Sequence, residues 1–299
     1  MPKYYCNYCN FRTIRIKKYN DHLLYNHRSD EKKIILTLSS CFYIIKKNKY
    51  NLDKYKYWIS NMLDNINNFN IVIYTNEESK YIFDNYKNNK KIKIIIKEYD
   101  DFYNYKYKDN WIENQKKNKS LNFIDWKVQL IWAEKISFVK NTIDNLYFDT
   151  EYYAWCDIGY FRWENSLPAY EVRKWPNNYK LNNINKNLIY YTDTKKLTQK
   201  QKEFQKNKIK CTNNLGIRIK PIKDSFIAGG FFLINKTNIN WWFDTFYKKI
   251  KFYFDNNFLI KDDQIIINDC YYSNPDKFHL IKEKFKTYQS GFAFSTYLL

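Results

Sequence analysis

The chain has 299 residues, 44% hydrophobic and 20% aromatic, which is enough to bury one large domain, alone or with a small one beside it. It carries 51 Lys and Arg against 31 Asp and Glu, and the net charge of +20 favours polyanionic partners such as nucleic acid, an anionic membrane or nucleotide phosphates. We expect no transmembrane helix, because no apolar run approaches the roughly 18 residues of a membrane span, and no secretory signal, because no apolar segment follows the initial Met-Pro-Lys. Five glycines and five prolines are too few for a collagen-like or linker-type chain.

The basic charge also has a compositional explanation. Abundant Lys, Asn, Ile, Tyr and Phe are typical of AT-rich coding, which supplies lysine without selection for a polyanion. Four of the six cysteines are scattered along the chain, as in proteins with reduced thiols. We therefore expect a cytoplasmic protein, and the composition is compatible with a virus-encoded protein acting in its host's cytoplasm.

Residues 1–28 contain a pattern of metal ligands. Cys6, Cys9, His22 and His27 have the spacing C-x2-C-x12-H-x4-H, and the whole chain has only three histidines. Zn(II) takes four nitrogen or sulfur ligands in a tetrahedron, and the spacing resembles that of the C2H2 zinc finger. We expect a ββα unit that requires structural zinc to fold.

The partner of this unit stays open at the level of sequence. If His22 is the seventh helix residue, the base-reading positions fall on Arg15, Lys18 and Asp21, within a basic segment. Nucleic-acid binding is one interpretation. A single finger covers only about 3 base pairs, so a structural or protein-binding role is the other.

After the finger, strands and helices are expected to alternate. Residues 34–45 are apolar and β-branched, broken by Ser39 and Ser40, which predicts a strand followed by a loop. Apolar residues three and four apart predict a helix over 51–69. Further along we predict, in order, a strand over 71–75, a helix over 77–87 capped by Asn76, a strand over 92–97 and a long loop over 100–122.

The second half begins with the clearest helix, over 124–145, which has one apolar stripe. A strand over 152–156 follows. The segment 176–222 interrupts the alternation, with a basic exposed helix over 195–210. The last expected elements are a strand over 226–234, an amphipathic helix over 240–255 and an element that starts at 261–264 and continues into IIIND.

This alternation predicts an α/β fold with a mostly parallel sheet flanked by helices. Ligands of such sheets bind beyond the carboxyl ends of the strands. We therefore expect Ser39, Thr75, Asn76 and Asp157 to lie on one rim.

Asp157 is the first candidate for chemistry. It follows an apolar strand and comes two residues before Gly159, which permits close approach by a ligand. One carboxylate plus diphosphate oxygens can hold Mg(II) or Mn(II), and Arg162 is placed to neutralise phosphate. The alternative is an ordinary turn residue. Asp149 and Glu151 form a rival pair that a solvated loop explains.

A second group of candidates lies further along the chain. In the run Asp262-Asp263-Gln264, one acid is a candidate base or acceptor-orienting group, although acids at a helix start also suit the helix dipole. The pair Gly229-Gly230 allows either substrate approach or tight packing. Lys135 interrupts its apolar stripe, so it is either a phosphate ligand or a snorkelling surface lysine.

Four runs carry a family resemblance: WAEKISFVKNTI, FDTEYYAWCDIGYFRW, SFIAGGFFLINKTNINWW and DDQIIIND. Residues 33–299 resemble the glycosyltransferase-like family that includes the bacterial HtrL/YibB proteins, and more broadly the GT-A glycosyltransferases. The resemblance implies a GT-A-like, Rossmann-like domain over 33–299, behind the zinc finger over 1–28. In GT-A enzymes a D-x-D motif binds metal and donor diphosphate. Here Asp157-Ile158-Gly159 matches it without the second Asp, which leaves dependence on Mn(II) or Mg(II) open.

The resemblance implies transfer of a sugar from a nucleotide-sugar donor to a hydroxyl of a glycan, protein or lipid. Ser39 and Thr75 would border the nucleotide, and Asp263 would match the acid near the acceptor. Two alternatives stay open: a non-enzymatic nucleic-acid-binding protein that acts through its finger, and a degenerate glycosyltransferase-like scaffold.

Overall fold

The structure is a computed structural model that describes most of the chain. The described residues are 4–5, 11–15, 18, 34–47, 49–162, 172–194, 198–209, 224–282, 292 and 294–298. Within them, no helix is long and apolar enough to cross a membrane.

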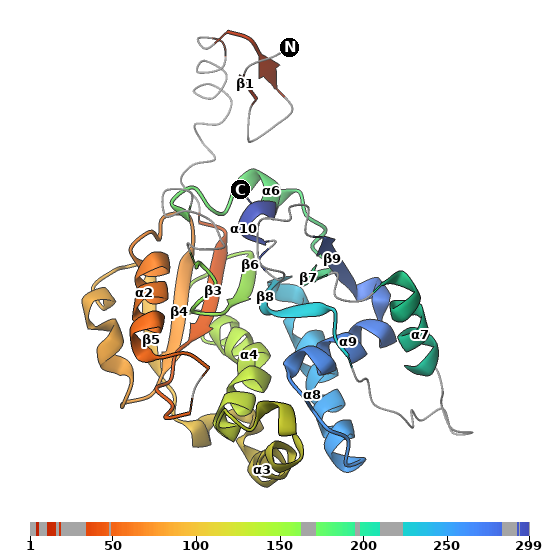
Figure 1. Ribbon diagram of the computed structural model, residues 1–299. Coiled ribbons are helices and arrows are strands. Elements are labelled where there is room, and N and C mark those ends of the chain that lie inside the picture. The colour runs from red at the N-terminus through yellow and green to blue at the C-terminus, as the bar shows by residue number, and fades with distance from the viewer. Residues whose placement is uncertain are drawn as a thin grey trace.

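A seven-stranded mixed sheet forms the centre of the molecule (Figure 1). Its spatial order is β5-β4-β3-β6-β8-β7-β9. The bounds are β3 (Leu36–Cys41), β4 (Asn70–Thr75), β5 (Ile92–Ile96), β6 (Tyr152–Cys156), β7 (Ile189–Asp193), β8 (Ile227–Asn235) and β9 (Phe278–Lys282). Among these described strands β8 alone runs against the rest, since it pairs antiparallel with both β6 and β7. The start of β8 therefore lies beside the carboxyl end of β6.

Helices cover both faces of this sheet. One face carries α4 (Trp126–Asp144), α8 (Ile239–Asp255) and α9 (Asp263–Ser273), and the other carries α2 (Leu52–Leu63) (Figure 1). Successive residues of β6 point to opposite faces, as the period of two in a strand requires: Tyr153 and Trp155 join the first core, and Tyr152 and Ala154 the second. The predicted two-sided α/β architecture is confirmed.

Two helix starts are set by local capping. Asp125 Oδ1 accepts a hydrogen bond from the Lys127 amide at the start of α4, and Asp262 Oδ1 accepts one from the Ile265 amide at the start of α9. These caps set where each helix begins, and therefore which of its residues face the sheet. The described residues also form α3 (Lys108–Lys117), α6 (Asn178–Asn182), α7 (Gln199–Ile209) and α10 (Phe294–Tyr297).

Several predicted boundaries are wrong in the first half. Ser39 and Ser40 do not break their strand, because both are fully buried within β3 and Ser39 shares a 2.7 Å hydrogen bond with Thr142. The helix predicted over 51–69 ends at Leu63. In place of an α-helix over 77–87 there is a 3-10 helix, Lys80–Tyr86, after a turn in which Asn76 Oδ1 accepts from the Ser79 amide.

Segments expected to be irregular contain regular structure. The stretch 100–122 holds 3-10 turns and α3, which buries Trp111. The stretch 176–222 contains β7, an internal strand whose five residues are all buried. The edge strand β9 is also a feature that the pattern did not indicate. Both strands are short, so neither has a strong period of its own.

The described residues near the N-terminus form a small antiparallel pairing. β1 (Tyr4–Tyr5) pairs with β2 (Arg12–Thr13), with Tyr4 opposite Thr13. The four predicted zinc ligands lie outside the described residues: Cys6, Cys9, His22 and His27. The zinc finger therefore stays a prediction.

Candidate functional site

Asp157 lies in the turn immediately after β6, at the mouth of an open pocket. Its amide donates to the Gly230 carbonyl oxygen at 2.8 Å, and its Oδ1 accepts from Trp155 Nε1 at 2.7 Å. The side chain is 40% exposed and faces a cavity of about 340 Å³. The antiparallel course of β8 produces this arrangement, because it places the Gly229-Gly230 backbone against the end of β6.

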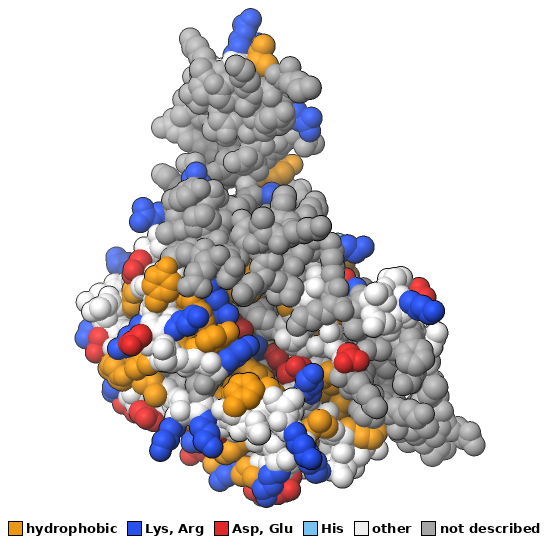
Figure 2. Space-filling view, viewed as in Figure 1, with side chains coloured by type: hydrophobic (Ala, Val, Ile, Leu, Met, Phe, Trp, Pro, Cys, Tyr) orange, Lys and Arg blue, Asp and Glu red, His pale blue; other side chains and the backbone are white. Residues whose placement is uncertain are grey.

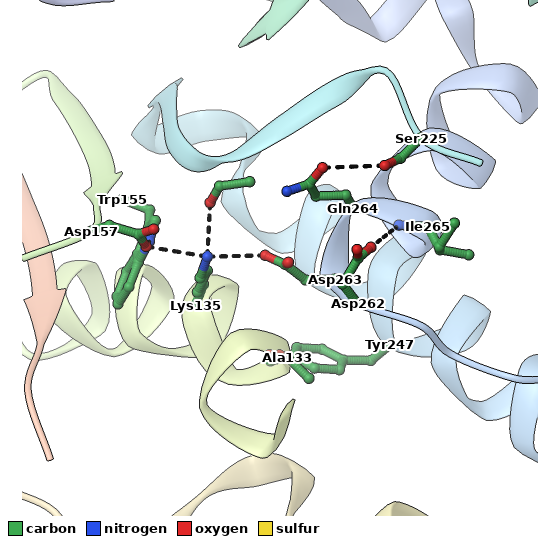
Figure 3. A network of polar contacts seen from close by, with 11 residues as sticks. Ala133, Lys135, Trp155, Asp157, Ser225, Tyr247, Asp262, Asp263, Gln264 and Ile265 are labelled. Carbon is green, nitrogen blue, oxygen red and sulfur yellow. Dashed lines mark hydrogen bonds and ion pairs between the residues drawn. The ribbon is translucent and has the colours of Figure 1, made fainter. Parts of the chain in front are cut away.

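Lys135 lies at the floor of the same pocket. It comes from the middle of α4, and its side chain is 8% exposed. Three oxygen atoms surround its Nζ: the Gly229 carbonyl at 2.9 Å, Asp263 Oδ2 at 3.0 Å and Asp157 Oδ1 at 3.2 Å. An ammonium has three protons, one for each of these oxygens. Figure 3 shows Lys135 between the two carboxylates, with all three contacts dashed.

Asp263 reaches this lysine from the first residue of α9. Its side chain is 5% exposed, and among the described residues the buried Oδ2 has no hydrogen-bond donor other than the ammonium. The neighbouring Asp262 also lines the pocket, but its Oδ1 accepts from the Ile265 amide and caps the helix. The two acids, adjacent in sequence, thus have different partners: Asp262 holds the helix start and Asp263 holds Lys135.

Burial and charge act on the ionisation of this pair in opposite directions. Burial raises the pKa of Asp263 to about 6, although the ammonium of Lys135 lowers it. Burial also works against the charged form of Lys135, but the carboxylates of Asp157 and Asp263 outweigh it and raise the pKa of that lysine. Lys135 therefore stays charged, and Asp263 titrates at a higher pH than an ordinary aspartate.

Arg162 forms another wall of the pocket. Its guanidinium stacks 4.0 Å from the ring of Trp58, and its Nε donates to the Gly159 carbonyl at 2.6 Å. A Cβ on Gly159 would lie 2.6 Å from Trp58 Cε3, so glycine is required for this close packing. Aromatic and apolar side chains line the rest: Phe42, Tyr43, Ile45, Tyr50, Tyr55, Leu121, Val128, Ile131, Trp132 and Trp155.

The structure brings most of the predicted site residues together. The pocket is lined by Lys135, Asp157, Gly159, Arg162, Gly229, Gly230, Asp262, Asp263 and Gln264. Gln264 shares a 3.2 Å hydrogen bond with Ser225 (Figure 3). The rival acids face elsewhere, since Asp149 pairs with Lys236 and Glu151 with Lys186.

Two predicted nucleotide-side residues do not line this pocket. Ser39 and Thr75 are fully buried in the sheet. The Ser39 hydroxyl bonds to Thr142, and the Thr75 hydroxyl donates to the Phe42 carbonyl at 2.7 Å. The Ser39 hydroxyl lies in the interior because β3 continues to Cys41, so the end of that strand comes later than the sequence indicated.

The aromatic lining is the part of the site that the sequence does not reveal. Trp132 belongs to the apolar stripe of α4, which the spacing assigns to the core, yet it lines the pocket. Tyr50 and Tyr55 lie around the start of α2. The high aromatic content is a signal, but nothing in the pattern separates core aromatics from those of a pocket wall.

The carboxylates of Asp157 and Asp263 do not form a Mn(II) or Mg(II) site between them. Among the described residues there is no group of three or more His, Cys, Asp and Glu side chains that would hold a metal ion. The two nearby carboxylates already share the ammonium of Lys135, and its charge would repel a divalent cation placed between them. The proposed reaction therefore has no step through a metal.

Comparisons with known proteins give structural neighbours only. No protein-family model matches the chain, and no curated protein matches its sequence. Similar solved structures include the galactosyltransferase LgtC in complex with donor and acceptor sugar analogs, at 10% identity over 82% of this chain and 72% of that one, with a TM-score of 0.44. An active-site mutant of LgtC gives a TM-score of 0.43 at 10% identity, over 82% of this chain and 72% of that one.

A third neighbour is 4-diphosphocytidyl-2C-methyl-D-erythritol synthase from Anaerococcus prevotii, at 9% identity over 85% of this chain and 89% of that one, with a TM-score of 0.37. Membership of the HtrL/YibB group stays a prediction, since no family model matches. A function for this chain therefore has to be argued from the geometry of the pocket.

Proposed function

We propose that this protein transfers a sugar from a nucleotide diphosphate sugar to a hydroxyl group of an acceptor. One observation carries the proposal: Asp157, at the carboxyl end of a central strand, lies at an open pocket with Asp263 across from it, and one ammonium joins the two carboxylates. This is the edge of an α/β sheet at which ligands bind. The resemblance of residues 33–299 to GT-A glycosyltransferases supports the same reaction class.

Asp263 serves as the general base in this proposal. The acceptor oxygen bonds to the anomeric carbon, the bond from that carbon to the diphosphate oxygen breaks, and the hydroxyl proton passes to the Asp263 carboxylate. The leaving group departs as the nucleoside diphosphate. A carboxyl group with a pKa raised to about 6 by burial is a better base at neutral pH than an ordinary aspartate.

The other pocket residues bind and orient the donor. Asp157 accepts hydrogen bonds from donor hydroxyl groups, and Arg162 contacts the diphosphate, whose charge grows as the bond breaks. Tyr50, Tyr55 and Trp132 offer ring faces to a base or a sugar. Gly229 and Gly230 leave room for the carboxylates of Asp263 and Asp157 beside the backbone, and Gln264 lines the same pocket.

The test is release of nucleoside diphosphate from a panel of UDP- and GDP-sugars. The wild-type chain should hydrolyse or transfer from at least one donor, and Asp157→Asn should reduce kcat/KM by about 100-fold or more, as loss of a positioned charged contact does. Asp149→Asn is the matched control, because that acid pairs with Lys236 outside the pocket. Undiminished activity in Asp157→Asn would remove the proposed site.

A second function concerns the N-terminal unit. We propose that residues 1–28 bind Zn(II) through Cys6, Cys9, His22 and His27 and contact nucleic acid or a protein. The antiparallel pairing of Tyr4–Tyr5 with Arg12–Thr13 supports this, since a ββα finger begins with such a hairpin. A nucleic-acid complex that is lost steeply with salt, and lost on deletion of 1–28, would favour the nucleic-acid partner.

The described part of the face drawn in Figure 2 offers less support for nucleic acid. Figure 2 shows Lys and Arg side chains spread over the described part of one face, with acidic and hydrophobic side chains between them. A duplex-binding surface would have a continuous basic stripe.

A catalytically degenerate scaffold is the alternative to the enzyme. Failure of every nucleotide sugar to raise the thermal unfolding temperature of the protein would favour it.

A further inference from the structure

The ammonium of Lys135 lies among oxygen atoms of the kind that bind divalent metal ions. Its Nζ is held by two carboxylates and one backbone carbonyl, which are the oxygen ligands that Mg(II) and Mn(II) prefer. The side chain of Lys135 is buried and comes from the middle of α4, so any displacement of its ammonium would break all three contacts. A fixed cation is thus built into the chain.

Gly229 leaves the space that the contact between Asp263 and Lys135 requires. A Cβ on Gly229 would lie 2.6 Å from Asp263 Oδ2, so a larger residue would displace the carboxylate from Lys135. The Gly229 carbonyl itself accepts from Nζ. The backbone of β8, the start of α9 and the end of β6 thus converge on one ammonium.

The charge of the pocket depends on this lysine. Its described lining holds three cations, Lys49, Lys135 and Arg162, and three carboxylates, Asp157, Asp262 and Asp263. The pocket is therefore neutral with all of them charged, and it would carry a net negative charge without Lys135. A negative pocket would repel a diphosphate.

We infer that Lys135 is the resident cation of the donor site, so that the nucleoside diphosphate binds there without a divalent metal ion. This inference rests on the proposed function, because it assigns the cation for that same donor. Lys135 acts as a positioning residue: its protons hold Asp157 and Asp263 in place and cancel charge that would oppose the diphosphate, while Arg162 faces the donor.

The first experiment needs no variant. Binding of UDP, GDP, CDP and ADP to the full chain is measured by titration calorimetry, in buffer stripped of metals by a chelating resin, with and without added Mn(II). We expect one nucleotide to bind with the same affinity, within about twofold, with and without Mn(II), because Lys135 already supplies the cation. Binding that requires Mn(II) overturns the inference and leaves the proposed function standing. No binding in either arm removes both.

The second experiment exchanges the cation. In Lys135→Met the stem is kept and the charge is lost, so metal-free nucleotide affinity should fall about tenfold or more, and Mn(II) should restore part of it by entering between the carboxylates. Electron paramagnetic resonance should show Mn(II) bound to Lys135→Met but not to the wild type. The double variant Lys135→Met with Asp157→Asn should not bind it either.

Lys140→Met is the matched control. Lys140 lies on the same helix, pairs with Asp144 and lies outside the pocket, so it should bind nucleotide as the wild type does. Unchanged metal-free affinity in a folded Lys135→Met chain contradicts the inference. If that variant does not fold, the wild-type titrations with and without Mn(II) still decide.

Discussion

Gly229 and Asp263 meet so closely that no side chain fits between them. A Cβ on Gly229 would lie 2.6 Å from Asp263 Oδ2, and the same carboxylate oxygen is 3.0 Å from Lys135 Nζ. The two residues come from different elements, β8 and α9, and 34 positions separate them along the chain. Their contact fixes where the buried carboxylate stands in the pocket.

Gly229→Ala should therefore damage activity more than folding. The added methyl group pushes the carboxylate away from Lys135, and a misplaced base loses rate, so we expect kcat to fall about 100-fold. Overpacking of this kind costs about 1–3 kcal/mol of stability, measurable by urea unfolding. Gly230→Ala is the comparison, because its Cβ would meet Asp157 Oδ2 at 3.4 Å, an ordinary contact, and its loss should be smaller. Equal losses in both variants would contradict the explanation.

The rate of transfer should depend on pH through Asp263. Its carboxyl group must be ionised to accept the acceptor's proton, and its pKa is raised to about 6. We expect kcat/KM to be level above that pH and to fall about tenfold per unit below it. A pH profile with saturating and subsaturating donor measures this. An acidic limb centred near pH 4, the ordinary range of an aspartate, would contradict the assignment.

Stability should change with pH in the opposite sense to the usual aspartate. The folded-state pKa of Asp263 lies above its unfolded value of 3.8, so the folded chain binds a proton more tightly at this residue than the unfolded chain does. The contribution of Asp263 to the free energy of unfolding is therefore complete below about pH 4 and is lost as the pH rises through about 6. Between pH 4 and pH 7 the wild-type chain should lose stability on the order of 1–3 kcal/mol through this residue, and Asp263→Asn should not show that loss. The difference between the two unfolding free energies, followed from pH 4 to pH 7, tests it; a difference that does not vary would contradict it.

Arg162 should matter for its shape as well as its charge. The guanidinium is stacked on Trp58 and tied to the Gly159 carbonyl, a geometry that an ammonium does not reproduce. Arg162→Ala should weaken nucleoside diphosphate binding about 10- to 100-fold, and Arg162→Lys should recover only part of it. Titration calorimetry gives both values. Full recovery in the lysine variant would show that charge alone is needed.

One zinc ion should bind per chain, held by the N-terminal unit. Cys6→Ser should lose the metal, as read by elemental analysis, because three ligands do not complete the tetrahedral site. Cys211→Ser is the control and should keep it. We expect donor hydrolysis to be the same in both variants, since the proposed donor pocket is lined by residues 41–264. Zinc retained in Cys6→Ser would remove the finger assignment.

Local sequence patterns determined where several elements lie and which residues come directly after them. The apolar stripe predicted α4 within two residues at each end, and the apolar run YYAWC predicted β6 with Asp157 just beyond it. The acids at 262 and 263 marked the start of α9. These features depend on side chains within one or two turns of each other and on capping, so they are visible without the rest of the chain.

Tertiary structure alone decided how those elements make a pocket. The reversed direction of β8 arises from its pairing with β6 and β7, and it sets Gly229 beside a lysine 94 positions earlier. The sequence misplaces Ser39 because the end of β3 depends on its neighbours. Whether Lys135 meets solvent or two carboxylates depends on burial and on long-range charge pairing, which no local period records.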